Sequence, residues 1–321
     1  MIKVSVLVPV YGVERYIEKC AISLFEQTYS DIEYVFVNDC TKDDSIGVLK
    51  RVLAKYPKRI QQVRIINHEK NMGLGAARRT AILNASGDYI LHVDSDDYIA
   101  KNAVEVLVKE TQTSNADIVD SAYADIDNDI TVSVKLPFHG DKAIYNDLII
   151  SRLGLVGNQI WGRLIRKSLY DDEVINHEGI DLGEDYSVLP ILLYKGKRSY
   201  TDETLYYYRT DNATSYMNSC LSKKHIESYI KANHVVYNFL SKKRIPKSTR
   251  YSLELGMLNL IVFCRRNKYD YAKSHFYVKQ NIDFWSLKIY RTLLTRIENI
   301  YLSLIFKALF TKKYKKFFSY V

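Results

Sequence analysis

The segment YILHVDSDD, residues 89–97, joins a short apolar run to three carboxylates. The apolar run follows a Ser-Gly pair and predicts a strand buried in a sheet. Asp94, Asp96 and Asp97 then come at the carboxyl end of this strand, where open α/β sheets place their ligands. Asp94 and Asp96, two residues apart, can hold a divalent cation through oxygen ligands. A solvated acidic turn that caps the next helix explains the same pattern, so this segment alone leaves both interpretations open.

The elements that would position these acids alternate along the first part of the chain. Strand patterns cover residues 3–8, 32–37, 63–67 and 89–93, and helix patterns cover 13–27, 44–56, 75–84 and 102–114. This alternation predicts an α/β fold with right-handed βαβ units and a mostly parallel sheet. The first strand ends in PVYG, which lacks the glycine fingerprint of a classical dinucleotide-binding fold.

The rest of the chain changes in character toward its end. A strand is expected near 117–122, a polar hairpin or excursion over 125–142, and mixed helix and strand over 143–215. From residue 225 the pattern is helical, with a break at Pro246. The last segment places apolar residues at helical spacing over 297–308, followed by four lysines within residues 312–316. We therefore expect a catalytic domain over 1–221 and a C-terminal helical region over 222–321.

The composition is that of a globular protein and the charge is strongly asymmetric. The chain has 321 residues, 47% hydrophobic and 26% charged, and no apolar run approaches the ~18 residues of a membrane span. Its four cysteines are scattered, which indicates reduced thiols and a cytoplasmic protein. Residues 222–321 contain 21 Lys or Arg against 5 Asp or Glu, a net charge of +16, whereas residues 1–221 carry −7. A tail of this kind favours an anionic partner.

Two other predicted strands also end in residues that could bind a ligand. Asp39 ends the second strand within VFVNDCTKDDS, where its carboxylate could accept a hydrogen bond from the imide N–H of uracil. Alternatively, Asp39 caps the following helix, a role that Asp43 or Asp44 could fill instead. Beside it, the residues Pro9, Val10 and Tyr11 could line the same base.

The segment NMGLGAARRTA, residues 71–81, opens the helix after the third strand. Gly73 permits close approach of the backbone, and Arg78 lies one turn into the helix, where it could meet a phosphate or a carboxylate. A simple loop with a surface arginine is the other interpretation. Three strand ends with ligand-type residues are nevertheless much rarer together than any one of them alone.

These motifs, in this order, resemble those of the family 2 inverting glycosyltransferases with the GT-A fold, over roughly residues 3–215. The resemblance implies a nucleotide site, most often for UDP, formed by Pro9, Val10, Tyr11, Asp39, Asn71, Gly73, Arg78, Asp94 and Ser95. It further implies that Asp96, with Asp94, coordinates Mn²⁺ or Mg²⁺ on the diphosphate. The chain departs from the family at Cys40-Thr41, where Gly-Ser is usual, and at Arg79, where asparagine is common.

The downstream motifs fit the same family. GEDYSVLP, residues 183–190, resembles its acidic motif, so Asp185 is the candidate catalytic base and Glu184 the alternative. An acid pair favoured by a helix dipole is the other explanation. By resemblance, Trp161 and Arg163 border the acceptor pocket, although Trp161 is equally typical of a protein core.

The leading hypothesis is therefore an inverting transferase that moves a sugar from a UDP-sugar to a hydroxyl of a glycan acceptor carried on a lipid, for cell-surface polysaccharide. The basic C-terminal helices would hold it at the inner face of the cytoplasmic membrane, unless they merely cap the domain. The alternatives are a sugar-nucleotide nucleotidyltransferase, which usually needs a glycine-rich basic loop that PVYGVERY lacks, and a non-catalytic polyanion-binding relative. No nucleic acid partner is expected.

Overall fold

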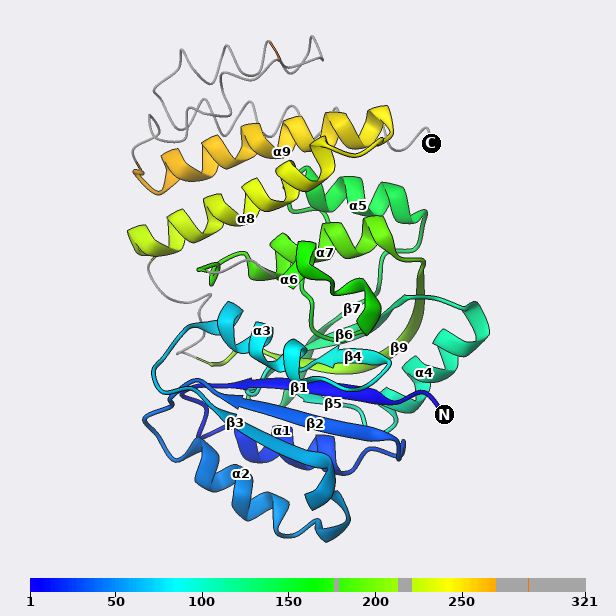
Figure 1. Cartoon of the computed structure of the whole chain (residues 1–321), viewed down its shortest axis with the longest axis vertical. Coiled ribbons are helices and arrows are strands. Elements are labelled where there is room, and N and C mark those ends of the chain that lie inside the picture. The colour runs from blue at the N-terminus through cyan, green and yellow to red at the C-terminus, as the bar shows by residue number, and fades with distance from the viewer. Residues whose placement is uncertain (176–178, 213–220, 270–287, 289–321) are drawn as a thin grey trace. The chain divides into compact units, whose positions relative to one another are not determined.

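The computed structural model describes residues 1–175, 179–212, 221–269 and 288. The chain forms two compact units (Figure 1). The first comprises residues 1–139, 159–181 and 195–220, and the second comprises 140–158, 182–194 and 221–321. This division differs from the expected boundary at 221/222, because two helices from within the first 221 residues group with the C-terminal helices. The predicted helix over 297–308 and the lysines after it lie outside the described residues.

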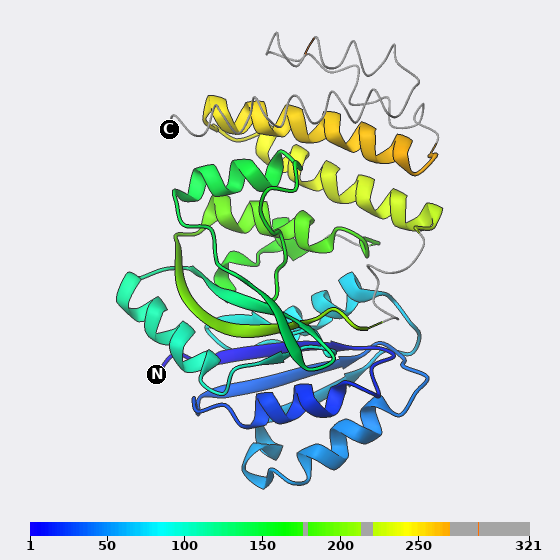
Figure 2. The same ribbon diagram turned by 180° about the vertical axis from the view of Figure 1, so that it is seen from behind.

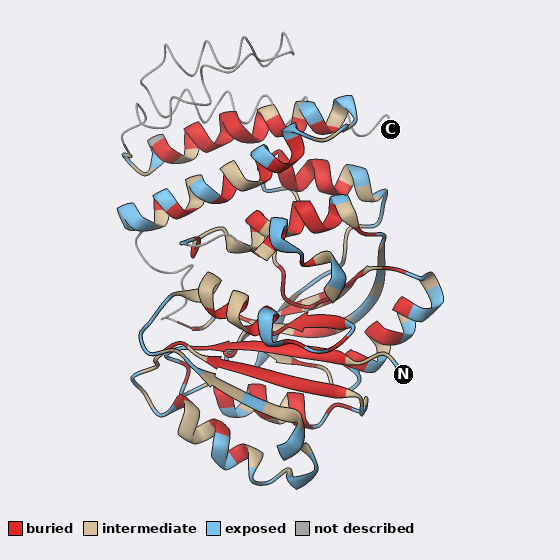
Figure 3. Cartoon of the chain, in the orientation of Figure 1, coloured by how far each residue is buried: buried red, intermediate tan, exposed pale blue. Residues whose placement is uncertain are grey.

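The first unit is built on one sheet with the strand order β3-β2-β1-β4-β8-β6-β9-β5. Its strands are β1 (Val4–Val10), β2 (Ile32–Asn38), β3 (Val63–Asn67), β4 (Tyr89–His92), β5 (Tyr98–Ile99), β6 (Ile118–Asp127), β7 (Ile130–Lys135), β8 (Arg163–Arg166) and β9 (Arg198–Arg209). The first four strands are parallel, as the alternating pattern predicted. β8 joins β4 antiparallel, and β6 pairs with β9 in parallel. All of β1 and nearly all of β2 are buried (Figure 3).

Helices cover both faces of the parallel strands. The helices of this unit are α1 (Ile17–Phe25), α2 (Ser45–Leu53), α3 (Leu74–Asn84), α4 (Ala103–Ser114) and α6 (Asp172–Ile175), with short 3-10 turns η1 (Pro57–Gln62) and η2 (Lys167–Leu169). Figure 1 and Figure 2 show α1 and α2 on one face of the β1–β3 strands and α3 on the other. Right-handed crossovers require this arrangement, because the chain moves outward from β1 to β3 and then returns to β4.

The polar excursion predicted over 125–142 begins as a β-hairpin, at the front of Figure 2. β6 and β7 are joined by Asn128 and Asp129, which have φ angles of 48° and 63°. Two successive residues with positive φ form the turn type whose twist matches that of the strands, and Asn and Asp tolerate it well. The carboxylate of Asp129 lies 2.7 Å from the Lys19 ammonium and 3.0 Å from the Arg209 guanidinium. The tip of the hairpin therefore links α1 to the end of β9.

The second unit is helical in its described part. It contains α5 (Lys142–Ile150), most of α7 (Glu184–Lys195), α8 (Lys223–Ser241) and α9 (Lys247–Arg266). The break expected at Pro246 separates α8 from α9. Ile226 of α8 packs with Met257, Leu260 and Cys264 of α9. α5 joins this group because Asn259 of α9 donates a hydrogen bond to the Ser151 carbonyl just after α5, at 2.8 Å.

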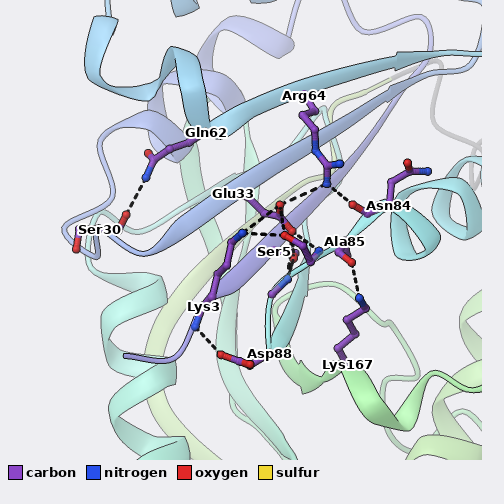
Figure 4. Close-up of polar contacts among 12 residues, drawn as sticks. Lys3, Ser5, Ser30, Glu33, Gln62, Arg64, Asn84, Ala85, Asp88 and Lys167 are labelled. Carbon is purple, nitrogen blue, oxygen red and sulfur yellow. Dashed lines mark hydrogen bonds and ion pairs between the residues drawn. The ribbon is translucent and has the colours of Figure 1, made fainter.

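A buried carboxylate, Glu33 of β2, ties the sheet to the start of β4 (Figure 4). Its Oε2 accepts a 2.7 Å hydrogen bond from the Ser86 hydroxyl, and its Oε1 accepts hydrogen bonds from Ser5 and from the Gly87 amide. Arg64 of β3 lies 3.3 Å away. Burial alone would raise the pKa of Glu33, but the hydrogen bonds from Ser5 and Ser86 outweigh it and lower the pKa from 4.5 to about 2.

This network predicts a specific acid sensitivity. Because the folded pKa lies below the unfolded value, the Glu33 contribution is complete above about pH 4.5 and is lost as the pH falls toward 2. We expect Glu33→Gln to lower the free energy of unfolding at pH 7 by about 2 kcal/mol after allowing for solvent screening. It should also flatten the pH dependence of urea unfolding between pH 4.5 and 2. Exposed Glu203→Gln is the control, and equal pH curves for wild type and Glu33→Gln would contradict the assignment.

Candidate active site

The acidic turn, which we define as residues 94–97, directly follows β4 at the carboxyl end of the parallel strands, as predicted. The amide of Val93 still donates to the Leu7 carbonyl of β1, at 3.0 Å, and the turn closes through a 3.1 Å hydrogen bond from the Asp97 amide to the Asp94 carbonyl. Asp94 and Asp96 are half-buried, whereas Ser95 and Asp97 are buried. Three carboxylates are therefore held within four residues at the end of a central strand.

The three acids have different surroundings. Asp94 pairs with Arg78 of α3, whose Nη2 lies 2.8 Å from Oδ1. Sequence reasoning named both a phosphate and a carboxylate as partners for Arg78, and in this structure the partner is a carboxylate. Burial, and next the Asp94 charge, raise the pKa of Asp96. Burial followed by the charges of Asp96 and Asp94 raises the pKa of Asp97 well above its usual range. The turn thus holds more negative charge than Arg78 neutralises, and added positive charge would stabilise it.

Asp97 belongs to the internal support of the turn. Its Oδ2 accepts a 2.7 Å hydrogen bond from the Tyr206 hydroxyl, and its Oδ1 accepts one of 2.7 Å from the Arg209 amide. The Tyr206 hydroxyl also accepts a 3.0 Å hydrogen bond from the Asp94 amide. Tyr206 and Arg209 both come from β9, more than a hundred residues later in the chain. β9 therefore determines the shape of the acidic turn.

Asp39, at the end of β2, organises the loop before α3. Asp39 is 3% exposed, and its carboxylate accepts hydrogen bonds of 2.8 Å from the amides of Met72 and Gly73. His68 Nδ1 lies 2.7 Å from the same carboxylate. Asp39 is not the cap of α2, because Asp43 accepts the hydrogen bonds from the amide and hydroxyl of Ser45. Its contact with a uracil ring stays a prediction.

Gly73 is required in this loop for two reasons. Its φ of 94° and ψ of 165° lie in a region essentially restricted to glycine. A Cβ built on Gly73 would lie 2.1 Å from an oxygen of the buried Asp181 carboxylate. The loop of residues 71–73 is therefore held between Asp39 and Asp181.

We expect Gly73→Ala to raise the KM for the sugar donor implied by the resemblance at least tenfold. The added Cβ would force the loop away from Asp181 and disturb its hydrogen bonds to Asp39. Gly154→Ala is the matched control, since Gly154 also has a positive φ, of 71°, but open space at the Cβ position. Both variants should lose about 1–2 kcal/mol of stability from backbone strain. Steady-state kinetics and urea unfolding measure the two effects. An unchanged donor KM in Gly73→Ala would show that the loop plays no part in donor binding.

The remaining nucleotide-site candidates lie near the same edge of the sheet. Pro9 and Val10 end β1 and are buried, whereas Tyr11 is 49% exposed. Asn71 is exposed and is the first residue of the loop held by Asp39. Cys40, where the family usually has glycine, has a φ of 57°, which explains why glycine is common there. Their contacts with a nucleotide remain predictions.

Trp161 and Arg163, the candidate acceptor residues, have internal partners. Trp161 is 9% exposed and stacks on Tyr206 and Tyr208, with ring centroids 4.4 and 5.2 Å away. This is the core environment that the sequence left open. Arg163 is buried and ion-paired with Asp120 of β6. Both side chains support the sheet, and their role toward an acceptor stays a prediction.

Glu184 and Asp185 begin α7 in the second unit, and both are half-buried. The preceding Gly183 has a φ of 86°, and a Cβ there would lie 3.2 Å from Ala232 of α8. Ser228 of α8 donates a hydrogen bond to the Leu182 carbonyl and accepts one from the Leu182 amide. The start of α7 is thus held by α8, and the role of Asp185 as base stays a prediction.

Within the described residues, no group of three or more His, Cys, Asp or Glu side chains forms a ready-made metal site. A cation at the acidic turn would take two carboxylates at most from these residues. Nor is any helix in the described part of the chain long and apolar enough to cross a membrane.

Sequence comparison decides the family. The model of "Glycosyl transferase family 2" matches residues 5–174, which span β1 to α6 and include the acidic turn. The chain belongs to glycosyl transferase family 2. The predicted family and enzyme class are therefore confirmed, and the nucleotidyltransferase and non-catalytic alternatives give way to a glycosyltransferase.

Two relatives lie within the same enzyme class. Glycosyltransferase GlyA of Streptococcus pneumoniae is 33% identical over 221 residues, 64% of this chain and 30% of that protein. The uncharacterized glycosyltransferase EpsJ of Bacillus subtilis is 30% identical over 244 residues, 73% of this chain and 70% of that protein. The chain thus spans less than a third of GlyA but more than two thirds of EpsJ.

The fold is also confirmed. S. aureus TarS 1–349, solved in complex with UDP-GlcNAc, matches this family 2 transferase with a TM-score of 0.63 at 20% identity. The match covers 90% of this chain and 79% of that chain. At this identity the likeness shows the GT-A fold alone.

Several residues that shape the site were not among the predicted site residues. Asp97 is part of the acidic turn. Contacts to Asp39 or to this turn come from His68, Tyr206 and Asn212, and Asp181 packs on Gly73. Only the acidic character of Asp97 was visible in the sequence. The others were hidden because their partners are distant in the chain.

Proposed function

We propose that this family 2 transferase moves a sugar from a UDP-sugar, with inversion, to a hydroxyl of a glycan acceptor carried on a membrane lipid. The observation that carries the proposal is the acidic turn, whose carboxylates lie at the carboxyl end of β4 and exceed the positive charge of Arg78. The UDP bound to TarS in its solved complex supports UDP as the nucleotide.

The acidic turn fits a divalent cation. It offers hard carboxylate oxygens, the ligands that Mn²⁺ and Mg²⁺ prefer, and burial followed by the charge of Asp94 raises the pKa of Asp96. Asp96, with Asp94, would hold the metal, and the diphosphate would complete the coordination. When bound, the ion would neutralise the charge that develops on the departing diphosphate.

The remaining parts of the mechanism, which are positioning and proton transfer, would come from side chains of this protein. Arg78 keeps Asp94 in place, and Asp39 orders the loop at Gly73 that borders the nucleotide. Asp185 would take the proton from the acceptor hydroxyl as the oxygen attacks the anomeric carbon. The new C–O bond forms while the bond to the diphosphate breaks, and UDP leaves with that electron pair. One displacement inverts the anomeric configuration.

A thermal-shift panel tests this function without knowledge of the acceptor. UDP, GDP, CDP and dTDP are each added with and without Mn²⁺, because a ligand that binds the native state raises its melting temperature. We expect a rise for UDP that requires Mn²⁺ and is lost in Asp96→Asn. A folded chain that responds to no nucleotide would refute the proposal.

For the acceptor side, we propose that the basic C-terminal region holds the enzyme at an anionic membrane surface. Deleting residues 297–321 removes a predicted amphipathic helix and its lysines. Because each basic residue near such a surface contributes about 1 kcal/mol, binding to anionic vesicles should fall at least tenfold. Sedimentation with anionic and neutral vesicles measures this loss. Unchanged binding would favour a helical cap on the domain.

A further inference from the structure

Three residues at or just after the end of β9 each contact the acidic turn, namely Tyr206, Arg209 and Asn212. Tyr206 and Arg209 support Asp97, as described above. Arg209 also donates through Nε to the main-chain carbonyl of Asp96, at 3.2 Å. Asn212 then donates its side-chain amide to Oδ2 of Asp96, at 2.7 Å. Asp96 is thus held at its backbone by one residue and at its carboxylate by another.

The chemistry of Asn212 suits a residue that orients a carboxylate without neutralising it. The amide is a neutral donor, so it does not offset the charge of the Asp96 carboxylate as a cationic partner would. Asp94 differs, because its partner Arg78 is a cation that offsets its charge. Asn212 is 3% exposed, so its side chain is fixed by packing. A lysine or arginine at this position would compete with the metal for Asp96.

We propose that Asn212 is a positioning residue that presents the Asp96 carboxylate to the divalent cation of the donor complex. The proposal rests on the proposed function, because it assumes that Asp96 meets the metal. Partners of this kind fix the orientation of a metal ligand, and their loss typically lowers metal affinity 10- to 100-fold. Nothing in the sequence indicates this role, since Asn212 and Asp96 are 116 residues apart.

The proposal is tested by titrating the full chain with Mn²⁺ in the presence of UDP and measuring the bound Mn²⁺ by electron paramagnetic resonance. Asn212→Ala should weaken Mn²⁺ binding about 10- to 100-fold, while UDP affinity in EDTA stays within twofold of wild type. Asn212→Ser keeps a hydroxyl donor and should recover part of the loss. If Asn212→Ala does not fold, the Mn²⁺ affinity of Asn212→Ser is compared with that of wild type instead. Asn233→Ala is the control, because it removes another buried amide, which donates to the Tyr229 carbonyl in the second unit.

The Asp96→Asn background shows whether Asn212 acts through Asp96. In that background Asn212→Ala should change Mn²⁺ affinity less than twofold. Wild-type Mn²⁺ affinity in Asn212→Ala, an equal loss of UDP affinity in EDTA, or the same fold-loss in the Asp96→Asn background would each overturn the proposal. A wild-type chain that binds no Mn²⁺ with UDP present would overturn the proposed function as well, which separates the two failures.

Discussion

Replacement of Asp96 by asparagine is expected to abolish metal-dependent turnover, with a loss in kcat on the order of 10³-fold. Asparagine keeps the shape of the side chain but removes the charge that would face the metal. Stabilisation of the leaving diphosphate by a metal amounts to several kcal/mol, and each 1.36 kcal/mol is a factor of ten in rate. The measurement is release of UDP from the donor, with and without Mn²⁺.

Asp171→Asn is the matched control for this prediction. Asp171 is an exposed acid of the first unit that pairs with Lys195. This variant should retain wild-type kcat and metal dependence. Burial and then the charge of Asp94 raise the pKa of Asp96. Removing the Asp96 carboxylate should therefore relieve its repulsion with Asp94, so Asp96→Asn should fold at least as stably as wild type. Full activity in Asp96→Asn would remove Asp96 from the metal site.

The second large effect is expected at the start of α7. Asp185→Asn should leave UDP and Mn²⁺ binding unchanged but lower the rate of transfer roughly 10²- to 10⁴-fold, the range of a lost general base. Glu184→Gln separates the two candidate bases, because only the true base should show a loss of this size. Transfer is measured in a single turnover with saturating donor, and binding by thermal shift. Normal transfer in Asp185→Asn, with a loss in Glu184→Gln, would reassign the base.

The local pattern of the chain was sufficient for the parallel half of the fold. β1 to β4 and the helices between them lie close to their predicted ranges, because the alternation of short apolar runs with apolar residues at helical spacing reflects burial within each element. The placement of Asp39 and the acidic turn at strand ends followed from the same alternation. Both positions were therefore predictable before any tertiary contact was known.

The supporting contacts were not predictable, because they depend on long-range pairing. β9 lies between β6 and β5, and only this register brings Tyr206 beneath the acidic turn. Trp161 and Arg163 were expected near the acceptor, but their surroundings depend on the same strand and on Asp120. The grouping of the helices was not predictable for a similar reason, since α5 groups with α9, about a hundred residues later.

The position of β9 has a consequence for engineering. The family match ends at residue 174, yet the acidic turn is supported by residues 206–212. A chimera that exchanges residues 1–174 between two transferases would separate Asp96 and Asp97 from the strand that holds them. The part of the chain that must be exchanged as a unit is therefore discontinuous in sequence, and it must include the segment around β9. Substitutions in the turn and at positions 206, 209 and 212 should then be compatible only in matched combinations.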